Sequence, residues 1–308
     1  MKLPNPRRMY EKARWLRSDG KPNFASVLRS RHSELKALVD SNVPVVSPQT
    51  PLLNCIEEMY KRRFRAVLVA KSNLFSGLLT FHDVADYLGG GYRHRIALER
   101  YGANLFKVLS IASQELMSKD IAYATADTPL EKVLELMVIG GFGLIPVTDS
   151  AGRPLGAVTE GSIVRAFSWR VGRRPVEDFM TRNVIVSKSE GRLGDVLRLM
   201  VSAGVRRVPL VSEDGSIRGV VSWRGVVDYI GSHRVFEILR EGLITEFLEL
   251  KPEEVADEDL LVVEPDTTLE YLVQKLLDRG LDYALVARGE ELAGIITERD
   301  IMYAVIGA

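Results

Sequence analysis

The chain has few of the features that mark secreted or membrane proteins. Cysteine occurs once, at Cys55, on the apolar stripe of an expected helix, so no intramolecular disulfide can form and we expect a core residue. No run of about 18 apolar residues exists, which excludes an ordinary transmembrane helix. No apolar segment follows the positive charges near the N-terminus, as a signal peptide would require. We therefore expect a cytoplasmic protein without a membrane partner.

Amide side chains are also scarce, because Asn and Gln together account for only ten of the 308 residues. Such a shortage, with abundant Arg, Lys and Glu, is typical of proteins from hot environments, so we expect a thermophilic source. The length is too great for one ordinary core. It indicates two domains or a repeat array.

Charge is balanced overall but unevenly distributed. Residues 1–33 hold nine Lys and Arg against two acids, whereas 240–300 hold 17 acids against six Lys and Arg. The basic arm 1–33 could contact nucleic acid. We favour the simpler interpretation, in which the arm is solvated or docks on the acidic half.

One unit of sequence occurs four times along the chain. Each copy has Asn or Asp before a short apolar strand, and a leucine that opens an amphipathic helix follows ten residues later. The four pairs are Asn42 and Leu52, Asp120 and Leu130, Asn183 and Leu193, and Asp259 and Leu269. Two β-rich runs joined by a turn come after each helix. The spacing predicts a β-α-β-β-α unit of about 55 residues.

Each copy ends in a glycine, two apolar residues and a hydroxyl residue that opens a second helix. These segments are GLLTFHD at 77–83, GAVTEGS at 156–162, GVVSWRG at 219–225 and GIITERD at 294–300. The leucine and the hydroxyl residue are 28, 29, 29 and 28 residues apart. Because one unit has an apolar sheet face that it cannot bury alone, we expect the units to pair.

This order of elements resembles the CBS domain, named from cystathionine β-synthase, and VEDFMTRNVIV at 176–186 is similar to the opening segment of that family. Four copies resemble the gamma subunit of AMP-activated protein kinase and archaeal stand-alone relatives. The resemblance implies an α+β (α/β) fold of two tandem pairs in a flattened disk. The expected divisions are an arm 1–33, a first pair 34–169 with repeats at about 34–90 and 113–169, and a second pair 175–308 with repeats at about 176–231 and 250–308.

The start of each second helix is the most informative place for ligand chemistry. Four hydroxyl residues are expected at helix N-caps, where unpaired N–H groups and the helix dipole favour phosphate. They are Thr80, Thr159, Ser222 and Thr297. Three residues further on, the carboxylates of Asp83 and Asp300 could accept hydrogen bonds from ribose hydroxyls. The second and third repeats have Ser162 and Gly225 at this position and therefore lack the carboxylate. The pattern Ser/Thr-x-x-Asp is also an ordinary capping motif, but four hydroxyl residues in register, two of them followed by this Asp, favour a ligand site.

The resemblance implies further binding residues. In the family, the ligand lies between the terminal motif and the first two strands of the same repeat. For the first repeat this implies Val43, Ala66, Thr80 and Asp83, and for the fourth Leu261, Tyr283, Thr297 and Asp300. Basic residues before the second strand contact phosphate in relatives, which implies Arg65 and the pair Arg206 and Arg207. Thr159 and Ser222 are weaker candidates.

One complete motif in each expected pair predicts two good sites and two degraded ones. The family's proline in the second strand occurs as Pro146 and Pro209, but the first and fourth repeats have Leu68 and Leu285 there. The geometry of the second strand could therefore differ at the two good sites, and the base need not be adenine.

No catalytic or metal constellation is present in the sequence: it has no HExxH, no Cys/His ligand spacing and no G-x-S-x-G. We therefore expect a regulatory protein, not an enzyme, that senses AMP, ADP or ATP, needs no catalytic cofactor and acts on an unidentified protein partner. The sequence leaves open whether the protein forms a homodimer. The alternatives are a nucleic-acid-associated or scaffold protein that uses residues 1–33, and the same fold binding S-adenosylmethionine, whose lack of phosphate would leave Arg206 and Arg207 without a role.

Overall fold

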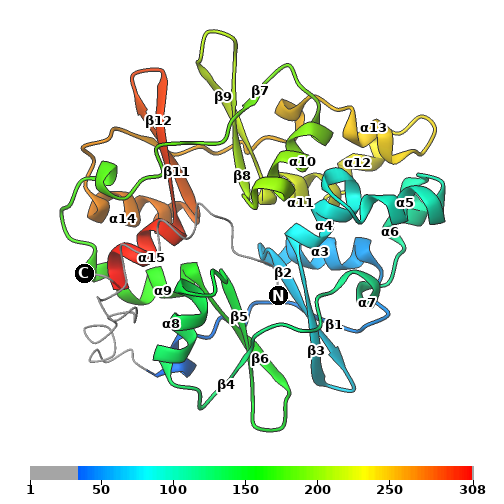
Figure 1. Cartoon of the computed structure of the whole chain (residues 1–308), viewed down its shortest axis with the longest axis horizontal. Coiled ribbons are helices and arrows are strands. Elements are labelled where there is room, and N and C mark those ends of the chain that lie inside the picture. Colours follow the sequence, from blue (N-terminus) through cyan, green and yellow to red (C-terminus); the bar gives the residue numbers. More distant parts are fainter. Residues whose placement is uncertain (1–33, 307–308) are drawn as a thin grey trace. The chain divides into compact units, whose positions relative to one another are not determined.

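The computed structural model describes residues 34–306, so the basic arm predicted at 1–33 lies outside the described residues. Within these residues the strands form four three-stranded sheets, each ordered as in the chain (Figure 1). In every sheet the first strand is parallel to the second and the third is antiparallel to it. The predicted β-α-β-β-α order is confirmed in all four repeats.

The elements of the first two repeats begin close to where the spacing places them. The first repeat consists of β1 (Val45–Val46), α3 (Leu52–Arg62), β2 (Ala66–Lys71), β3 (Leu74–Thr80) and α4 (Phe81–Ala85). The second consists of β4 (Ala124–Thr125), α8 (Leu130–Val138), β5 (Leu144–Thr148), β6 (Pro154–Thr159) and α9 (Glu160–Phe167).

The last two repeats follow the same plan. The third consists of β7 (Ser187–Lys188), α10 (Leu193–Ala203), β8 (Arg207–Val211), β9 (Ile217–Ser222) and α11 (Trp223–Gly231). The fourth consists of β10 (Val262–Val263), α14 (Leu269–Arg279), β11 (Tyr283–Arg288), β12 (Glu291–Thr297) and α15 (Glu298–Ile306). All four first helices start at the predicted leucine, and α14 buries Leu269, Leu272, Val273 and Leu276 along one stripe.

Short helices fill the connections between repeats. They are η1 (Leu35–Leu38), η2 (Asp86–Gly90), α5 (His94–Tyr101), α6 (Leu105–Leu109), α7 (Ser113–Leu116), η3 (Ser168–Arg170), η4 (Val176–Asp178), α12 (Arg234–Glu237), α13 (Ile244–Leu248) and η5 (Pro252–Val255).

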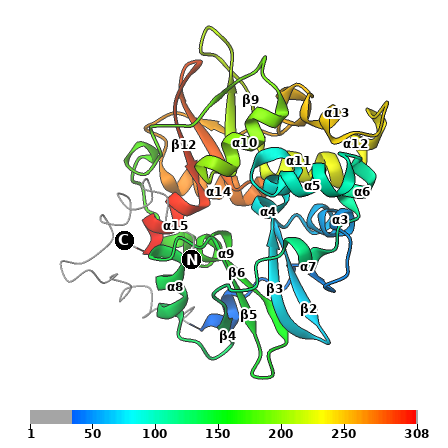
Figure 2. The same ribbon diagram turned by 45° about the vertical axis from the view of Figure 1, so that its right-hand side comes forward.

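The described residues divide into two compact units, each with its own hydrophobic core. The 1/3 unit, residues 42–121 and 185–259, contains the first and third repeats, and the 2/4 unit contains the second and fourth with the described residues up to Ser41. In the 1/3 unit α11 packs on α3, and in the 2/4 unit α15 packs on α9 (Figures 1 and 2). Each predicted pair, 34–169 and 175–308, joins a repeat of one unit with a repeat of the other. The pairing therefore stays a prediction.

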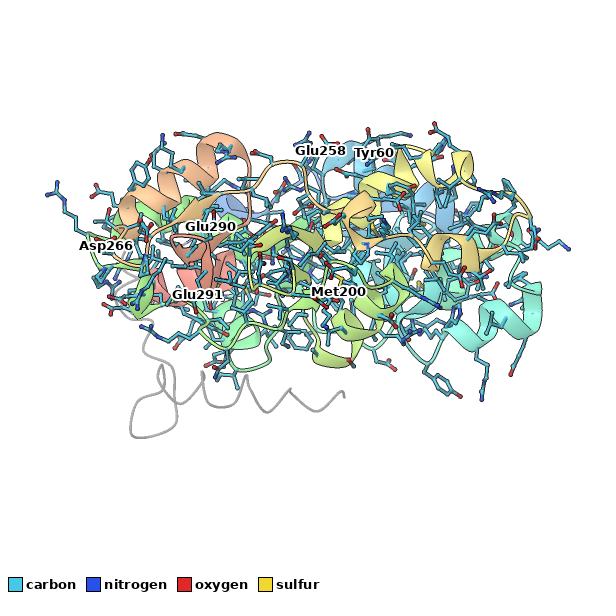
Figure 3. All side chains as sticks on the ribbon, turned by 90° about the horizontal axis from the view of Figure 1, so that it is seen from above. Tyr60, Met200, Glu258, Asp266, Glu290 and Glu291 are labelled. Carbon is cyan, nitrogen blue, oxygen red and sulfur yellow. The ribbon has the colours of Figure 1, made fainter. Side chains whose placement is uncertain are left out.

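Helix packing in the 1/3 unit is close enough to require glycine. A Cβ on Gly231 of α11 would lie 2.6 Å from the Cβ of Tyr60 in α3. Tyr60 and Met200, both labelled in Figure 3, differ in exposure: Tyr60 is 38% exposed and Met200 of α10 is 1% exposed. The buried apolar residues of α3 and those of α10 belong to the same hydrophobic core.

A connector covers the outer edge of the third strand in every repeat. Backbone hydrogen bonds join Leu78 to Ser118, Ala157 to Asp40, Val220 to Asp257, and Ile295 to Thr181. Each connector precedes a different repeat in the chain, so the first and second repeats exchange connectors, and so do the third and fourth. Pairing protects an edge that would otherwise expose unpaired backbone groups.

This exchange explains the glycine that opens the terminal motif of the first and second repeats. A Cβ on Gly77 would lie 2.9 Å from the carbonyl oxygen of Ser118, and one on Gly156 would lie 2.5 Å from that of Asp40. Real Cβ atoms do not approach backbone oxygen so closely. The glycine therefore leaves room for the connector.

Candidate ligand site

The hydroxyl residue of each terminal motif stands directly before the second helix. Thr80 accepts a hydrogen bond from Asp83 N at 3.4 Å, and Thr159 accepts one from Ser162 N at 3.0 Å. Ser222 accepts from Gly225 N at 3.2 Å. The prediction of helix N-caps is confirmed at these three positions, and Thr297 directly precedes α15.

The two complete motifs share one local geometry. In the first repeat, Thr80 donates to Asp83 Oδ2 from its backbone N at 2.9 Å and from its hydroxyl at 2.7 Å. In the fourth repeat, Thr297 makes both bonds to Asp300 Oδ2 at 2.8 Å. Each threonine therefore orients its carboxylate through a single oxygen, and Oδ1 is the oxygen turned to other partners.

The surroundings of the two carboxylates differ. Asp83 is 6% exposed, and its Oδ1 lies 3.0 Å from Nη1 of Arg93, a residue of the connector after the first repeat. Asp300 is partly exposed. The next residue back in the chain, Arg299, is turned away from solvent into a buried ion pair with Glu160 in α9. As a whole residue, Asp300 is more exposed than Asp83.

The third repeat obtains a carboxylate from another part of the chain. Its motif has Gly225 where the complete motifs have Asp, but Ser222 donates to Asp257 Oδ1 at 2.6 Å. A Cβ on Gly225 would lie 2.2 Å from the carbonyl oxygen of Val255. The connector 255–257 therefore fills the place that an Asp side chain would need.

The second repeat closes its motif with two hydroxyls. Ser162 Oγ accepts from Thr159 N at 2.9 Å and donates to the Thr159 carbonyl at 3.0 Å. Both side chains are buried. A shallow depression of about 370 Å³ lies beside Ser162, lined by Ala37, Leu38, Asp40, Ser162, Arg165 and Ala166.

Repeats with and without the second-strand proline differ in how the first strand pairs with the second. Leu68 N donates to the carbonyl of Pro44 at 2.8 Å, and Leu285 N donates to that of Leu261 at 2.9 Å. Pro146 and Pro209 have no N–H, and their sheets begin pairing one residue later, at Val147 and Leu210. The geometry at the first and fourth repeats thus differs from that at the other two, as the sequence suggested.

The structure places the other predicted residues beside the motifs, with one correction of register. Ala66 is paired with Thr80 and Tyr283 with Thr297 across the hairpins, and both are buried. Val43 and Leu261 were matched as equivalent, but this match is wrong, because Leu261 occupies the position of Pro44. The parallel pairing of the first two strands shows this register. The spacing of the repeats already implies it, because Pro44 and Leu261 each lie two residues after the Asn or Asp that opens the repeat.

The predicted phosphate-binding arginines also lie at the hairpins. The carbonyl of Arg65 accepts from Phe81 N and that of Arg206 accepts from Trp223 N, both at 2.9 Å. Arg207 is 8% exposed and is paired with Ser222. The part of all these residues in ligand binding stays a prediction.

Arg93 and Asp257 were not found from the sequence. Both lie in connectors, with no repeat spacing to mark them. In the described part of the chain, no group of three His, Cys, Asp or Glu side chains is placed to hold a metal ion. Among residues 34–306 there is also no helix that is long and apolar enough to cross a membrane.

Fold and site together define a protein of four structural repeats, each with a hydroxyl-capped helix after a glycine-opened strand. The family model for the CBS domain matches four segments of this chain, at residues 35–90, 112–168, 176–232 and 253–307. The chain belongs to the CBS domain family. All four connectors that cover a third strand fall inside these matched segments.

Similar proteins of nearly the same length occur in archaea. The uncharacterized protein MJ1225 of Methanocaldococcus jannaschii is 24% identical over 272 residues, covering 87% of this chain and 97% of that protein. A 33.4 kDa protein in a ribosomal RNA operon of Thermofilum pendens is 27% identical over 273 residues, covering 88% and 91%.

Solved structures share the fold. The crystal structure of MJ1225 aligns with a TM-score of 0.81 at 23% sequence identity, covering 87% of this chain and 98% of that one. A conserved Pyrococcus horikoshii protein aligns with a TM-score of 0.54 at 17% identity, covering 88% and 99%.

Proposed function

We propose that this chain is a regulatory protein that binds an adenine nucleotide, AMP, ADP or ATP, and acts through binding, not catalysis. The observation that carries the proposal is the pair Thr297 and Asp300, in which the threonine fixes one carboxylate oxygen. The other oxygen, Oδ1, suits the hydroxyls of a ribose, because a carboxylate accepts several hydrogen bonds. The position is partly exposed.

The start of α15 supports a phosphate in the same place. This helix has nine residues and begins directly after Thr297, so its first N–H groups and its dipole favour an anion. A sugar held by Asp300 and a phosphate near Thr297 would match the two ends of a nucleoside phosphate.

The comparisons support a regulatory role. The similar protein MJ1225 is described as a proposed archaeal homologue of the gamma subunit of AMP-activated protein kinase. A ligand that favours one packing of the repeats over another would change the binding of a protein partner.

A thermal-shift screen tests the proposal. AMP, ADP, ATP and S-adenosylmethionine are added to the wild type, to Asp300→Ala and to Asp266→Ala, a control at an exposed position outside the motif (Figure 3). A ligand at 100 times its Kd stabilises the folded state by about 2.7 kcal/mol. We expect the phosphate-containing compounds to raise the melting temperature of the wild type and the control only.

Two results would contradict the proposal. One is the absence of a shift with every compound, and the other is an equal shift in the wild type and in Asp300→Ala. A shift with S-adenosylmethionine alone would keep the sugar site but reject the phosphate.

A further inference from the structure

The first repeat has a complete motif, yet the chain itself occupies the carboxylate. We propose that Arg93 blocks the sugar-binding position at Asp83, so that the fourth repeat, and not the first, takes the nucleotide. This inference rests on the proposed function and assigns its binding to one of the two complete motifs. Arg93 then determines which of the two complete motifs binds the nucleotide.

The contacts of Thr80 and Arg93 together account for both oxygens of Asp83. Thr80 already holds Oδ2 through two hydrogen bonds, at 2.9 and 2.7 Å. Nη1 of Arg93 lies 3.0 Å from Oδ1. The oxygen that would accept a ribose hydroxyl is therefore in an ion pair, and the carboxylate side chain is 8% exposed.

Arg93 is held in place by three segments of the 1/3 unit. Its backbone N donates to Asp86 Oδ1 at 3.1 Å, and its Nε lies 3.7 Å from Asp86 Oδ2. The same Nη1 that contacts Asp83 also donates to the carbonyl of Leu116. Leu116 ends α7, two residues before Ser118, which pairs with the strand of the motif.

A nucleotide could reach Asp83 only by removing this guanidinium from two acceptors at once. The side chain of Arg93 is 29% exposed, so its charge would lose partly buried partners. Such a loss is costly, because a partly buried charge depends on its partners. A neutral ribose hydroxyl offers Asp83 a weaker hydrogen bond than an arginine does.

The third repeat gives an independent parallel in the same unit. There the connector brings Asp257 to Ser222 and Val255 against Gly225. Both motif positions of the 1/3 unit are thus filled by this chain's own connectors. In the 2/4 unit, Asp300 is partly exposed.

Calorimetric titration with AMP tests the inference. We expect the wild type to bind one AMP per chain, Asp300→Ala to bind none, and Asp83→Ala to bind one with unchanged affinity. We expect Arg93→Met, which keeps the apolar stem but removes the guanidinium, to bind two. Adding Asp83→Ala to Arg93→Met returns the number to one.

Arg95→Met is the matched control. It removes the same charge two residues away, at an exposed side chain that pairs with Glu99, and we expect it to bind one AMP. The Asp83→Ala arm does not depend on the folding of Arg93→Met, whose melting curve is recorded alongside.

The outcomes separate the two proposals. A wild type that binds two AMP, one of them lost in Asp83→Ala, overturns the role of Arg93 while the proposed function stands. Arg93→Met that folds and binds one AMP also overturns it. A failure of both the wild type and Arg93→Met to bind AMP overturns this inference and contradicts the proposed function as well.

Discussion

Arg299 and Glu160 form a buried ion pair that joins the second and fourth repeats inside the 2/4 unit. The side chain of Glu160 is 1% exposed and that of Arg299 is 13% exposed. Burial by itself would lower the pKa of Arg299, but the Glu160 carboxylate raises it, and the net direction is upward. A second hydrogen bond runs from Arg299 Nη2 to the carbonyl of Gly141 at 3.2 Å.

Replacing Arg299 by methionine should destabilise the protein strongly, because it leaves the carboxylate of Glu160 buried beside an apolar side chain. Removal of one partner from a buried pair costs about 3–5 kcal/mol. The measurement is the free energy of unfolding from urea titration.

The control for this change is Arg153→Met, which breaks an exposed pair with Asp149. We expect a much smaller effect there, because exposed ion pairs contribute little. Equal losses in the two variants would show that the Arg299 pair is not dependent on burial.

Gly225→Ala should destabilise the third repeat although alanine favours helix. Alanine gains about 1 kcal/mol over glycine inside a helix, but its Cβ would lie 2.2 Å from the carbonyl oxygen of Val255. Overpacking of this kind costs about 1–3 kcal/mol. The two effects oppose each other, and we expect the clash with rigid backbone to win in urea titration.

Gly194→Ala serves as the comparison, because Gly194 is also helical and its nearest neighbour would lie 3.3 Å from the new Cβ. We expect this variant to be closer to the wild type. If Gly225→Ala proved as stable as Gly194→Ala, the connector 255–257 would not be packed as described.

The single cysteine gives a prediction for alkaline pH. Burial raises the pKa of Cys55 from 9.0 to about 12, and Glu58 adds to the shift. The folded state thus holds the neutral thiol, while the unfolded state loses its proton at lower pH. The contribution of Cys55 to stability is present below pH 9 and is lost as the pH rises toward 12.

Comparison of the wild type with Cys55→Ala between pH 7 and pH 11 checks this sign. We expect the stability advantage of the wild type to be constant up to about pH 9 and to fall above it. A constant difference through pH 11 would mean that the thiol is not buried in the folded state.

Much of the fold follows from spacing alone. The four leucines predict the first residue of α3, α8, α10 and α14, because each begins an apolar stripe of helical period ten residues after the Asn or Asp that opens its repeat. The four hydroxyls predict the helix starts after β3, β6, β9 and β12. Both signals are local, since each depends on residues within one repeat.

The remaining features depend on contacts between distant residues. Arg93 meets Asp83 and Asp257 meets Ser222 through connectors whose composition carries no motif. By contrast, the equivalence of Leu261 and Pro44, which the strand pairing shows, also follows from spacing, because each lies two residues after the Asn or Asp that opens its repeat.

A crystal structure of the full chain grown with AMP tests the central claim most directly. The account predicts ribose hydroxyls within hydrogen-bond distance of the Asp300 carboxylate and a phosphate near Thr297 at the start of α15. Density for the nucleotide away from both residues would contradict it. So would a structure grown at a saturating concentration of AMP with no nucleotide density beside Asp300.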